Sequence, residues 1–365
     1  MRSHDRRAAI ERLLRERGSV SVAPLAEELG SSPVSIRRDL ADLAERGIAR
    51  RVHGGAVAIP EDRGTPQVVH QRRVHGRRPA PMIGLVVPTP GYYFGPILEG
   101  IRVAARQAGV RLVLAVSEYD SDRERTQIRG LIEAGARALI VTPAVSVETD
   151  PTTYDLLLEL SIPVVLMERR VGDRYRRLDC VRSDHSFGSR LAIQHLLDAG
   201  HQGIALVTFA DTPTSRGLVR GFDHLSDELD ESRSGTIRMA TLGLSNATDP
   251  VQGRAEAALE RCLELGATGV VVHPDVAAIA FAEQARARNI DVPGGLSVVA
   301  YDDEYAGMAD PPLDAVAPPK AAVGSVTMSI CLERIRGEGP GTPAHVTLLP
   351  ELLKRGSVDE RMLIK

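Results

Sequence analysis

The chain has 365 residues, of which 43% are hydrophobic and 25% are charged, which suits two or three folded domains and excludes a disordered chain. It contains no run of ~18 apolar residues, and its N-terminus is charged where a secretory signal would be apolar, so we expect a cytoplasmic protein with no membrane segment. The cysteines Cys180, Cys262 and Cys331 form no Cys-x-x-Cys pair, which argues against a disulfide framework and a zinc site.

The formal net charge of -3 is unevenly distributed along the chain. Residues 1–81 contain 16 Arg and 10 Asp or Glu, whereas residues 82–365 contain 29 basic and 38 acidic residues. A basic head on an acidic body indicates that the head alone contacts a polyanion such as DNA. Because 42 of the 45 basic residues are Arg, arginine content by itself does not mark a DNA-binding site.

Helical patterns and then a hairpin pattern fill residues 1–59. Three short helices are predicted, each ending near a glycine, at residues 5–17, 24–29 and 33–46. Ser32-Pro33 is a typical helix start, because the hydroxyl caps the helix and proline lacks an N–H that would need a partner there. Residues 48–59 have two short β-prone runs around Gly54-Gly55, which predict a hairpin. Together these elements predict a winged helix-turn-helix domain.

A linker and a larger α/β region follow. Residues 60–81 are rich in Pro, Gly and Arg without sustained periodicity, so we interpret them as a linker. Continuous apolar runs then alternate with helix-like segments, at 82–87, 111–116, 137–142, 162–167, 203–208, 268–273 and 296–301. This pattern is typical of parallel sheets covered on both faces. The number of runs favours two doubly wound α/β lobes over a single sheet.

The third predicted helix has two different faces. Its buried stripe, at 3.6-residue spacing, consists of Ile36, Leu40 and Leu43. The opposite face, at the N-terminal end that a recognition helix places in the major groove, carries Val34, Ser35 and Arg38. We expect Arg38 to read a base, because a guanidinium can donate to O6 and N7 of one guanine. We expect Arg37 to contact phosphate.

The context of these arginines favours DNA binding over the alternative, in which they pair with acidic neighbours on a solvated helix. Residues 10–57 resemble the DeoR-family winged helix-turn-helix nearly throughout, with both the S-I-R-R-D-L core and the trailing HGGA. The resemblance implies that Ser35, Arg37 and Arg38 lie on the recognition helix. At Pro33-Val34 the sequence departs from the polar residues usual in that family. We expect the DNA phosphates to lie near three residues beside the wing turn: Arg50, Arg51 and His53.

The HGGA segment has an alternative interpretation, since His-Gly-Gly loops also form oxyanion holes in lipases and esterases. Such enzymes need a G-x-S-x-G nucleophile, which this sequence lacks. Phosphate-binding, zinc-protease and dinucleotide-binding motifs are also missing from it. We therefore expect no enzymatic activity, no cofactor and no metal site.

Residues 82–353 resemble the effector-binding core of LacI-family repressors, a relative of periplasmic sugar-binding proteins. The resemblance is carried, in order, by IGLVVPTPGYYFGPILEGIRVAARQAG, IPVVLMERR, SDHSFGSRLAIQHLLDAGHQGIALV and VPGGLSVVAYDDEYAGMADPPLDAV. It implies two lobes with an effector between them at the carboxyl ends of the strands. The chain is expected to cross between lobes near Gly200, Leu313 and His345. The implied segments are lobe 1 at about 82–199 and 316–344, lobe 2 at about 200–315 and 345–353, and a C-terminal tail at 354–365.

A sugar-like effector needs carboxylates and guanidinium groups for its hydroxyls and aromatic rings for its C–H face. Asp302 follows the run LSVVAY and matches the family's effector-binding aspartate, with a helix-cap or hinge role as the alternative. Three of the chain's twelve Phe and Tyr residues lie in one loop, and we expect at least one of them to face the effector: Tyr92, Tyr93 and Phe94. Phe187 is a further stacking candidate that is equally compatible with a core position.

Two positions depart from the LacI-family pattern. Where the family has an arginine three residues before Gly-Phe, this chain has Leu218. Arg216 and Arg220 are both available as replacements, and we choose Arg216 because Arg220 could equally face solvent. Asp275 matches the aspartate of the family's Asn-Asp motif, but Pro274 replaces the asparagine. The sequence therefore leaves the identity of the effector open.

These observations predict a transcriptional repressor that binds double-stranded operator DNA through its N-terminal domain and a small sugar-like effector through its α/β lobes. We expect a homodimer, because a single recognition helix buries too little DNA surface for tight specific binding. A solute-binding receptor without DNA regulation is the first alternative. An enzyme acting on a sugar is the second.

Overall fold

The computed structural model describes residues 3–17, 19–45, 49–52, 55–58, 80–209, 212–232, 238–243, 250–339 and 341–359. The chain forms two compact units, Met1–Pro66 and Gln67–Lys365. Most of the expected linker, 60–81, lies outside the described residues, which resume at Ala80. No helix in the described part of the chain is both long and apolar enough to span a membrane.

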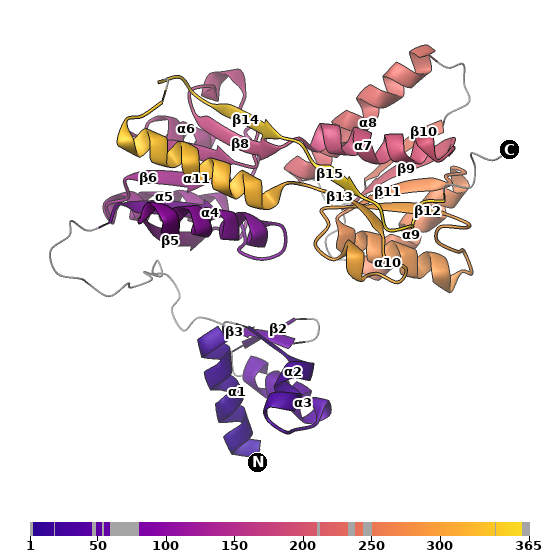
Figure 1. Cartoon of the computed structure of the whole chain (residues 1–365), viewed down its shortest axis with the longest axis horizontal. Helices are drawn as coiled ribbons and strands as arrows, with labels where there is room; N and C mark the ends of the chain where they lie inside the picture. The colour runs from indigo at the N-terminus through magenta and orange to yellow at the C-terminus, as the bar shows by residue number, and fades with distance from the viewer. Residues whose placement is uncertain are drawn as a thin grey trace. The chain divides into compact units, whose positions relative to one another are not determined.

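The N-terminal unit is a winged helix-turn-helix (Figure 1). Its helices are α1 (Ser3–Arg17), α2 (Val22–Glu28) and α3 (Pro33–Glu45). Its antiparallel sheet has the order β1 (Ser19–Ser21), β3 (Gly55–Ala58), β2 (Ala49–Val52). The predicted helices and hairpin are confirmed to within a few residues. Strand β1 is not predicted, because three residues are too few to show an alternating pattern.

Aliphatic side chains hold this unit together. The core shared by the three helices includes Ile10, Leu25, Ile36, Leu40 and Leu43. At the start of α3, the Ser35 N–H donates to the Ser32 hydroxyl at 3.1 Å, which caps the helix as its sequence predicts. The predicted apolar stripe of α3 therefore faces the core, and the opposite face of the helix is turned away from it.

The first lobe of the larger unit is a parallel sheet with the strand order β14-β8-β7-β6-β4-β5 (Figure 1). Its strands are β4 (Met82–Val87), β5 (Arg111–Val116), β6 (Ala138–Val141), β7 (Val164–Met167), β8 (Asp179–Ser183) and β14 (His345–Leu348). One face is covered by α4 (Phe94–Ala108) and α11 (Lys320–Arg336). The other face is covered by α5 (Ser121–Glu133) and α6 (Thr152–Leu158), and a 3-10 turn, η1 (Asp173–Tyr175), packs nearby.

The second lobe has the strand order β10-β9-β11-β12-β13-β15, parallel except for β15. Its strands are β9 (Gly203–Thr208), β10 (Arg238–Gly243), β11 (Gly269–His273), β12 (Ser297–Tyr301), β13 (Asp314–Ala317) and β15 (Glu351–Leu353). One face is covered by α7 (His185–Asp198) and α8 (Pro213–Ser232). The other is covered by α9 (Val251–Glu264) and α10 (Asp275–Ala287), with the 3-10 turn η2 (Ala306–Met308). The predicted pair of doubly wound lobes is confirmed.

The chain crosses between the lobes at different residues from those expected. The first crossing is at Asp184 rather than near Gly200, because α7 packs beside α8 in the core of the second lobe. The second follows β13, at Pro318-Pro319 rather than near Leu313, because β13 pairs with β12. The third follows β14 rather than preceding it at His345, because β14 pairs with β8. Figure 1 shows this last crossing as the yellow segment between β14 and β15.

Residues 354–359, the described part of the C-terminal tail expected at 354–365, pack as part of the second lobe. Asp314 Oδ1 accepts hydrogen bonds from the N–H groups of Arg355, Gly356 and Ser357 at 2.6, 2.7 and 3.1 Å. Val358 is buried in the same core as α7 and α8. The sequence pattern misses this docking, because hydrogen bonds to one buried carboxylate leave no periodicity.

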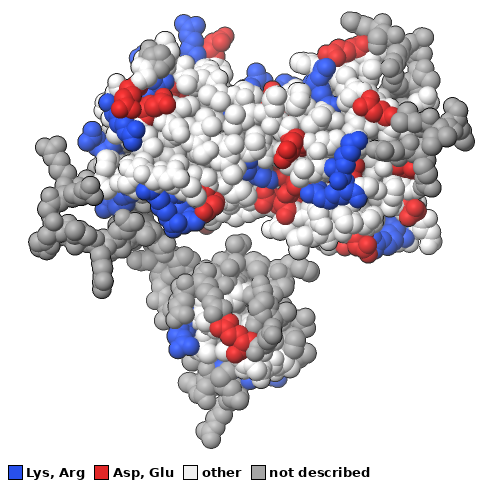
Figure 2. Space-filling model, viewed as in Figure 1, with Lys and Arg blue, Asp and Glu red and all other residues white. Residues whose placement is uncertain are grey.

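Ion pairs are frequent on the larger unit. Basic and acidic side chains lie next to one another on the face that Figure 2 shows. Arg190 binds Glu228 at 2.7 Å, and Arg288 binds Glu260 at 2.6 Å. The half-buried Arg334 binds Asp179 through two hydrogen bonds of 2.8 Å. Arginine is thus commonly matched by a carboxylate in this unit.

Candidate DNA-binding and effector-binding sites

The exposed end of α3 is the candidate DNA-reading surface. Arg38 is exposed, and among the described residues no carboxylate lies within ion-pair distance of it. Two acidic neighbours of Arg38 on α3, Asp39 and Asp42, are bound from α1 instead. Arg6 Nε donates to Asp39 at 2.5 Å, and Arg7 Nη1 donates to Asp42 at 2.7 Å. Of the two interpretations from the sequence, DNA binding and pairing with acidic neighbours, this arrangement favours the first, because the Arg38 guanidinium is exposed.

The other expected DNA contacts lie on α3 and on the wing. Ser35 is in the first turn of α3, where its hydroxyl lies 3.0 Å from that of Ser32. For four residues the structure describes the backbone alone, which places Val34 and Arg37 on α3 and Arg50 and Arg51 on β2. His53 lies outside the described residues. The base and phosphate contacts of these residues stay predictions.

Tyr92 connects the two lobes at the carboxyl ends of their strands. It lies between β4 and α4 with a positive φ of 45°. Its hydroxyl donates to Asp275 Oδ1 at 2.6 Å and lies 3.1 Å from Asp302 Oδ2, both in the second lobe. Burial, and then the negative charges of Asp302 and Asp275, raise the pKa of Tyr92 far above its usual value. The hydroxyl therefore stays protonated and acts as a donor.

The two carboxylate oxygens of Asp275 have different hydrogen-bond partners. Its Oδ2 accepts hydrogen bonds from the N–H groups of Glu304, Tyr305 and Ala306 at 2.7, 2.5 and 3.1 Å, which holds the loop after β12 in place. Its Oδ1 faces the hydroxyl of Tyr92. Asp275 is therefore built into the wall between the lobes and leaves one oxygen directed at the space where the lobes meet.

Asp302 is the least satisfied carboxylate of this region. It is 2% exposed, and its Oδ1 has no hydrogen-bond partner among the described residues. Burial alone would raise the pKa of Asp302, but the charges of His273, His185 and Lys320 and a hydrogen bond from His273 lower it overall. The ring Nε2 of His273 lies 3.5 Å from Asp302 Oδ2. Asp302 is therefore an ionised acceptor with an unused lone pair.

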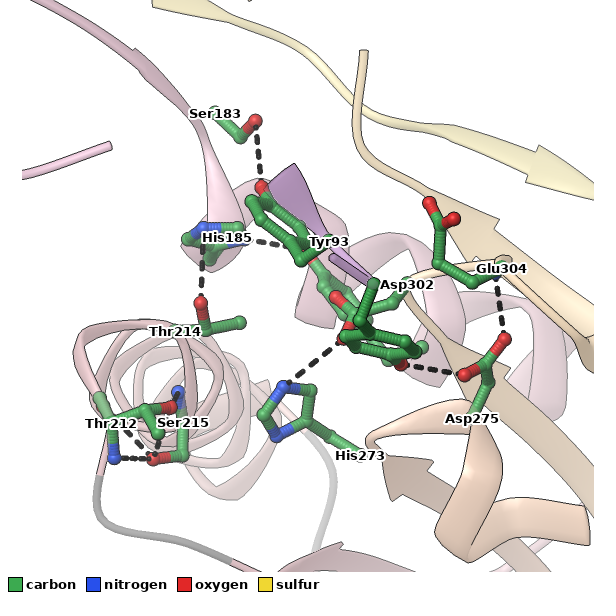
Figure 3. A network of polar contacts seen from close by, with 12 residues as sticks. Tyr93, Ser183, His185, Thr212, Thr214, Ser215, His273, Asp275, Asp302 and Glu304 are labelled. Atoms are coloured by element: carbon green, nitrogen blue, oxygen red, sulfur yellow. Dashed lines mark hydrogen bonds and ion pairs between the residues drawn. The ribbon is translucent and has the colours of Figure 1, made fainter. Parts of the chain in front are cut away.

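Tyr93 belongs to a second group of polar contacts, to which both lobes contribute (Figure 3). Its hydroxyl donates to Glu168 Oε1 at 3.1 Å, and the hydroxyl of Ser183 donates to the same oxygen at 2.8 Å. His185 lies 3.6 Å from Glu168 and 3.1 Å from the hydroxyl of Tyr301. Burial opposes the charge of Glu168, but His185 and Ser183 outweigh it and lower the pKa of Glu168.

The remaining expected effector residues lie in three different settings. Phe94 is 5% exposed and packs in the core of the first lobe, so of the three neighbouring aromatics only Tyr92 and Tyr93 reach the polar network. Phe187 is 38% exposed in the first turn of α7. Arg216, on α8, donates to Ser146 of the other lobe at 2.9 Å. That contact places Arg216 where the two lobes meet, and its expected contact with the effector stays a prediction.

Several polar residues of this region are missed by the sequence reasoning: Glu168, Ser183, His185, His273 and Lys320. Glu168 and His273 directly follow or end a predicted strand, which is the position that marks Asp302. Ser183 instead ends β8, which the sequence does not predict, and His185 begins α7. Lys320 opens α11, and its ammonium contacts the carbonyl oxygen of Asp302 and the carboxylate of Glu304. No local signal identifies Lys320, because its partners lie in the loop after β12, before the intervening strand β13.

Comparison with known proteins agrees with both units. A family model described as a DeoR-like helix-turn-helix domain matches residues 6–62. A second, described as a periplasmic binding protein-like domain, matches residues 193–358. A solved structure of the lac repressor dimer bound to operator and the anti-inducer ONPF has a TM-score of 0.63 at 20% identity, and covers 76% of this chain and 94% of that one.

Two relatives extend the comparison in sequence. An HTH-type transcriptional regulator from Streptomyces limosus is 32% identical over 290 residues, which cover 77% of this chain and 80% of the relative. The arabinose metabolism transcriptional repressor of Geobacillus stearothermophilus is 26% identical over 344 residues, which cover 92% and 90%. The chain therefore belongs to the LacI family of transcriptional regulators and carries a DeoR-like helix-turn-helix as its DNA-binding domain.

Proposed function

We propose that this transcriptional regulator is a cytoplasmic repressor whose affinity for operator DNA is set by a small, sugar-like effector bound between its two lobes. The observation that carries the proposal is Asp302, a buried and ionised carboxylate with one unused oxygen. Leaving a buried acceptor unpaired costs about 1–3 kcal/mol, and a ligand hydroxyl would recover that cost. The proposal treats Tyr92, Tyr93, Arg216, Asp275 and Asp302 as effector contacts, with Phe187 as a stacking candidate.

Tyr92 makes a contact between the lobes that a bound effector would replace. Its hydroxyl bridges two carboxylates of the opposite lobe, as a ligand hydroxyl would do. An effector with adjacent hydroxyls can replace this single donor with two and hold the lobes in a different relative position. A ligand shifts such an equilibrium by its difference in affinity for the two arrangements, so the contacts of Asp302 set the size of the response.

The names of the relatives support a carbohydrate effector and a two-fold assembly. One relative is a repressor of arabinose metabolism, and one related structure is a dimer with operator and a small anti-inducer. A homodimer also follows from physical need, because one recognition helix covers a single half-site. Sedimentation of the full chain at micromolar concentration, with and without operator, tests this part, and a monomer in both conditions would contradict it.

The central experiment compares two neighbouring carboxylates. An operator is first selected from random DNA, and an effector is found by thermal-shift screening of pentoses, hexoses and their phosphates. Asp302→Asn should then weaken the effector response at least tenfold while leaving operator binding by the free protein within twofold. Asparagine tolerates the positive φ of 100° at this position, so the variant tests charge rather than backbone strain.

Asp303→Asn is the matched control, because Asp303 also has a positive φ but pairs with Arg355 at 2.8 Å. It should respond to the effector like the wild type. An Asp302→Asn protein that responds at the wild-type effector concentration would place the effector elsewhere. A variant that no longer binds operator at all would make Asp302 a structural residue.

A further inference from the structure

A cavity of about 380 Å³ lies beside the polar contacts around Tyr93, and both lobes contribute to its wall. From the first lobe come Arg170, which follows β7, and Arg182 on β8. From the second lobe come Arg220 and His224 on α8. The cavity thus brings together cationic side chains from three separate segments of the chain, next to the crossing at Asp184.

Close packing of α7 and α8 positions the second-lobe side of the cavity. A Cβ atom at Gly217 would lie 2.8 Å from the Cβ of His185, and one at Gly221 would lie 2.2 Å from the carbonyl oxygen of Ser186. Glycine at these two positions therefore lets the middle of α8 approach the first turn of α7. Arg220, between the two glycines, is held close to the crossing.

The positive charge in this cavity is not matched within the protein. Among the described residues, no carboxylate lies within ion-pair distance of Arg170, Arg182 or Arg220, in contrast to the pairing on the rest of the unit. Burial, followed by the charges of Arg170 and Arg182, lowers the pKa of Arg220, and the opposing charge of Glu148 offsets this only in part. Three like charges thus repel one another unless an anion joins them.

The carboxylates in the cavity wall are already engaged. Glu168 accepts hydrogen bonds from the N–H and the hydroxyl of Ser183 and from Tyr93. Asp184 caps α7 by accepting from the N–H of Phe187 at 3.0 Å. The buried Arg169 is also occupied, because it donates to the carbonyl oxygens of Pro143 and Glu168. Within the described part of the chain, the guanidinium groups of Arg170, Arg182 and Arg220 in this wall have no carboxylate partner.

We infer that this cavity binds the phosphate group of a phosphorylated metabolite, with Arg170 and Arg182 on one side and Arg220 on the other. Guanidinium groups match phosphate oxygens with two parallel hydrogen bonds, which makes arginine well suited to this group. The volume lies within the range of small-molecule pockets and exceeds the needs of a bare ion. The inference deepens the proposed function, on which it rests, by naming a sugar phosphate as the class of effector.

The position of the cavity links the anion to the proposed switch. Ser183 and His185 line the cavity and also contact the network that contains Tyr93, Glu168 and Tyr301. The hydroxyls of a sugar phosphate anchored at the arginines would therefore lie beside that network. Because the arginines belong to different lobes, the bound anion also draws the lobes together across the crossing at Asp184.

The test measures binding of inorganic phosphate to the full chain by calorimetry, at ionic strength held constant with chloride. Arg220→Gln and, independently, the exposed Arg170→Gln should each lower phosphate affinity at least tenfold. Arg129→Gln is the matched control, because Arg129 is exposed on α5 and is not part of the cavity wall. Wild-type affinity in both cavity variants, or an equal loss in the control, would overturn the inference.

A second arm separates this inference from the proposed function. Ribose 5-phosphate and glucose 6-phosphate are compared with ribose and glucose for binding and for their effect on operator affinity. The phosphorylated forms should bind at least tenfold more tightly, and Arg220→Gln should remove that difference. Neutral sugars that bind equally well and change operator affinity would overturn the phosphate site but keep the proposed function. Phosphate binding at the arginines without any effect of either sugar class on operator affinity would keep the phosphate site but overturn the proposed function.

Discussion

The arginines of the N-terminal unit and those of the cationic cavity are used in different ways. On α1, Arg6 and Arg7 meet Asp39 and Asp42 of α3, and these pairs fasten one helix to another. Around the cavity, Arg170, Arg182 and Arg220 have no such carboxylate within the described part of the chain. In a protein with 42 arginines, the residue type alone does not indicate a role. The presence or absence of a carboxylate partner distinguishes arginines that stabilise the fold from those that we propose bind a ligand.

The largest effect that this comparison predicts is at Asp39. It is 4% exposed and lies 2.5 Å from Arg6 Nε, so Asp39→Ala leaves a largely buried guanidinium without its counter-charge. We expect a loss of about 2–4 kcal/mol in the unfolding free energy of the N-terminal unit, and with it a loss of operator binding. Scanning calorimetry of the full chain measures the change. Asp42→Ala is the control, because its pair is more exposed and should contribute only about 0–1 kcal/mol.

Arg38, which has no partner in the described part of its unit, should behave in the opposite way. Arg38→Ala should leave the unfolding temperature unchanged and cost about 1–3 kcal/mol in operator binding, with relaxed preference at one base pair per half-site. Arg37→Ala should weaken binding to all sequences and reduce its salt dependence. Titration of variant DNA sites at several salt concentrations measures both. Unchanged sequence preference in both variants would refute the predicted orientation of α3.

The comparison between charged groups with and without a partner extends to a carboxylate, Glu124, which is fully buried and has few hydrogen-bond partners. Burial raises its pKa to about 7, despite the N–H of Ala144 at 2.6 Å and the charge of Arg169. The folded state therefore holds a proton that the unfolded state releases near its ordinary pKa, so this residue makes stability fall as the pH rises from about 4.5 to 7. Glu124→Gln should remove that slope and stabilise the protein by about 1–3 kcal/mol above pH 7. Urea unfolding at pH 5 and pH 8 measures it, and an equal change at both would contradict the assignment.

The smallest expected effect is on the stability of the cavity variant. Arg220→Gln removes one of three mutually repelling charges, so its unfolding free energy should stay the same or rise by up to about 1 kcal/mol, because solvent screens a half-exposed group. A clear loss of stability in urea unfolding without ligand would show that Arg220 is a structural clamp like Arg6. The comparison between the two groups of arginines would then fail.

Much of the fold can be predicted from local patterns. The stripe of Ile36, Leu40 and Leu43 and the apolar strand runs depend on spacing of two or 3.6 residues, which sequence shows directly. The crossings cannot be located in that way. The side chains of α7 suit either lobe, and only the packing of Ile193 and Leu196 beside α8 assigns that helix to the second one.

The candidate effector site was predictable only in part. Position after a strand suggests Asp302 and a match to the family motif suggests Asp275, and the structure brings both to Tyr92. Glu168 and His273 lie at equivalent strand ends and are not predicted. The sequence groups Phe94 with Tyr92 and Tyr93 as effector candidates. In the structure Phe94 begins α4, and its ring packs in the core of the first lobe. The cationic cavity leaves no motif at all, since Arg170, Arg182 and Arg220 come from a loop, a strand and a helix.

The return of the chain to both lobes after α11 has a consequence for folding during synthesis. The edge strand β14 belongs to the first sheet and β15 to the second, so neither sheet is complete until residues 345–353 have left the ribosome. The N-terminal unit needs no residue beyond 66 and can fold long before that point. A nascent chain can therefore fold its helix-turn-helix before the two sheets that flank the proposed effector site are complete.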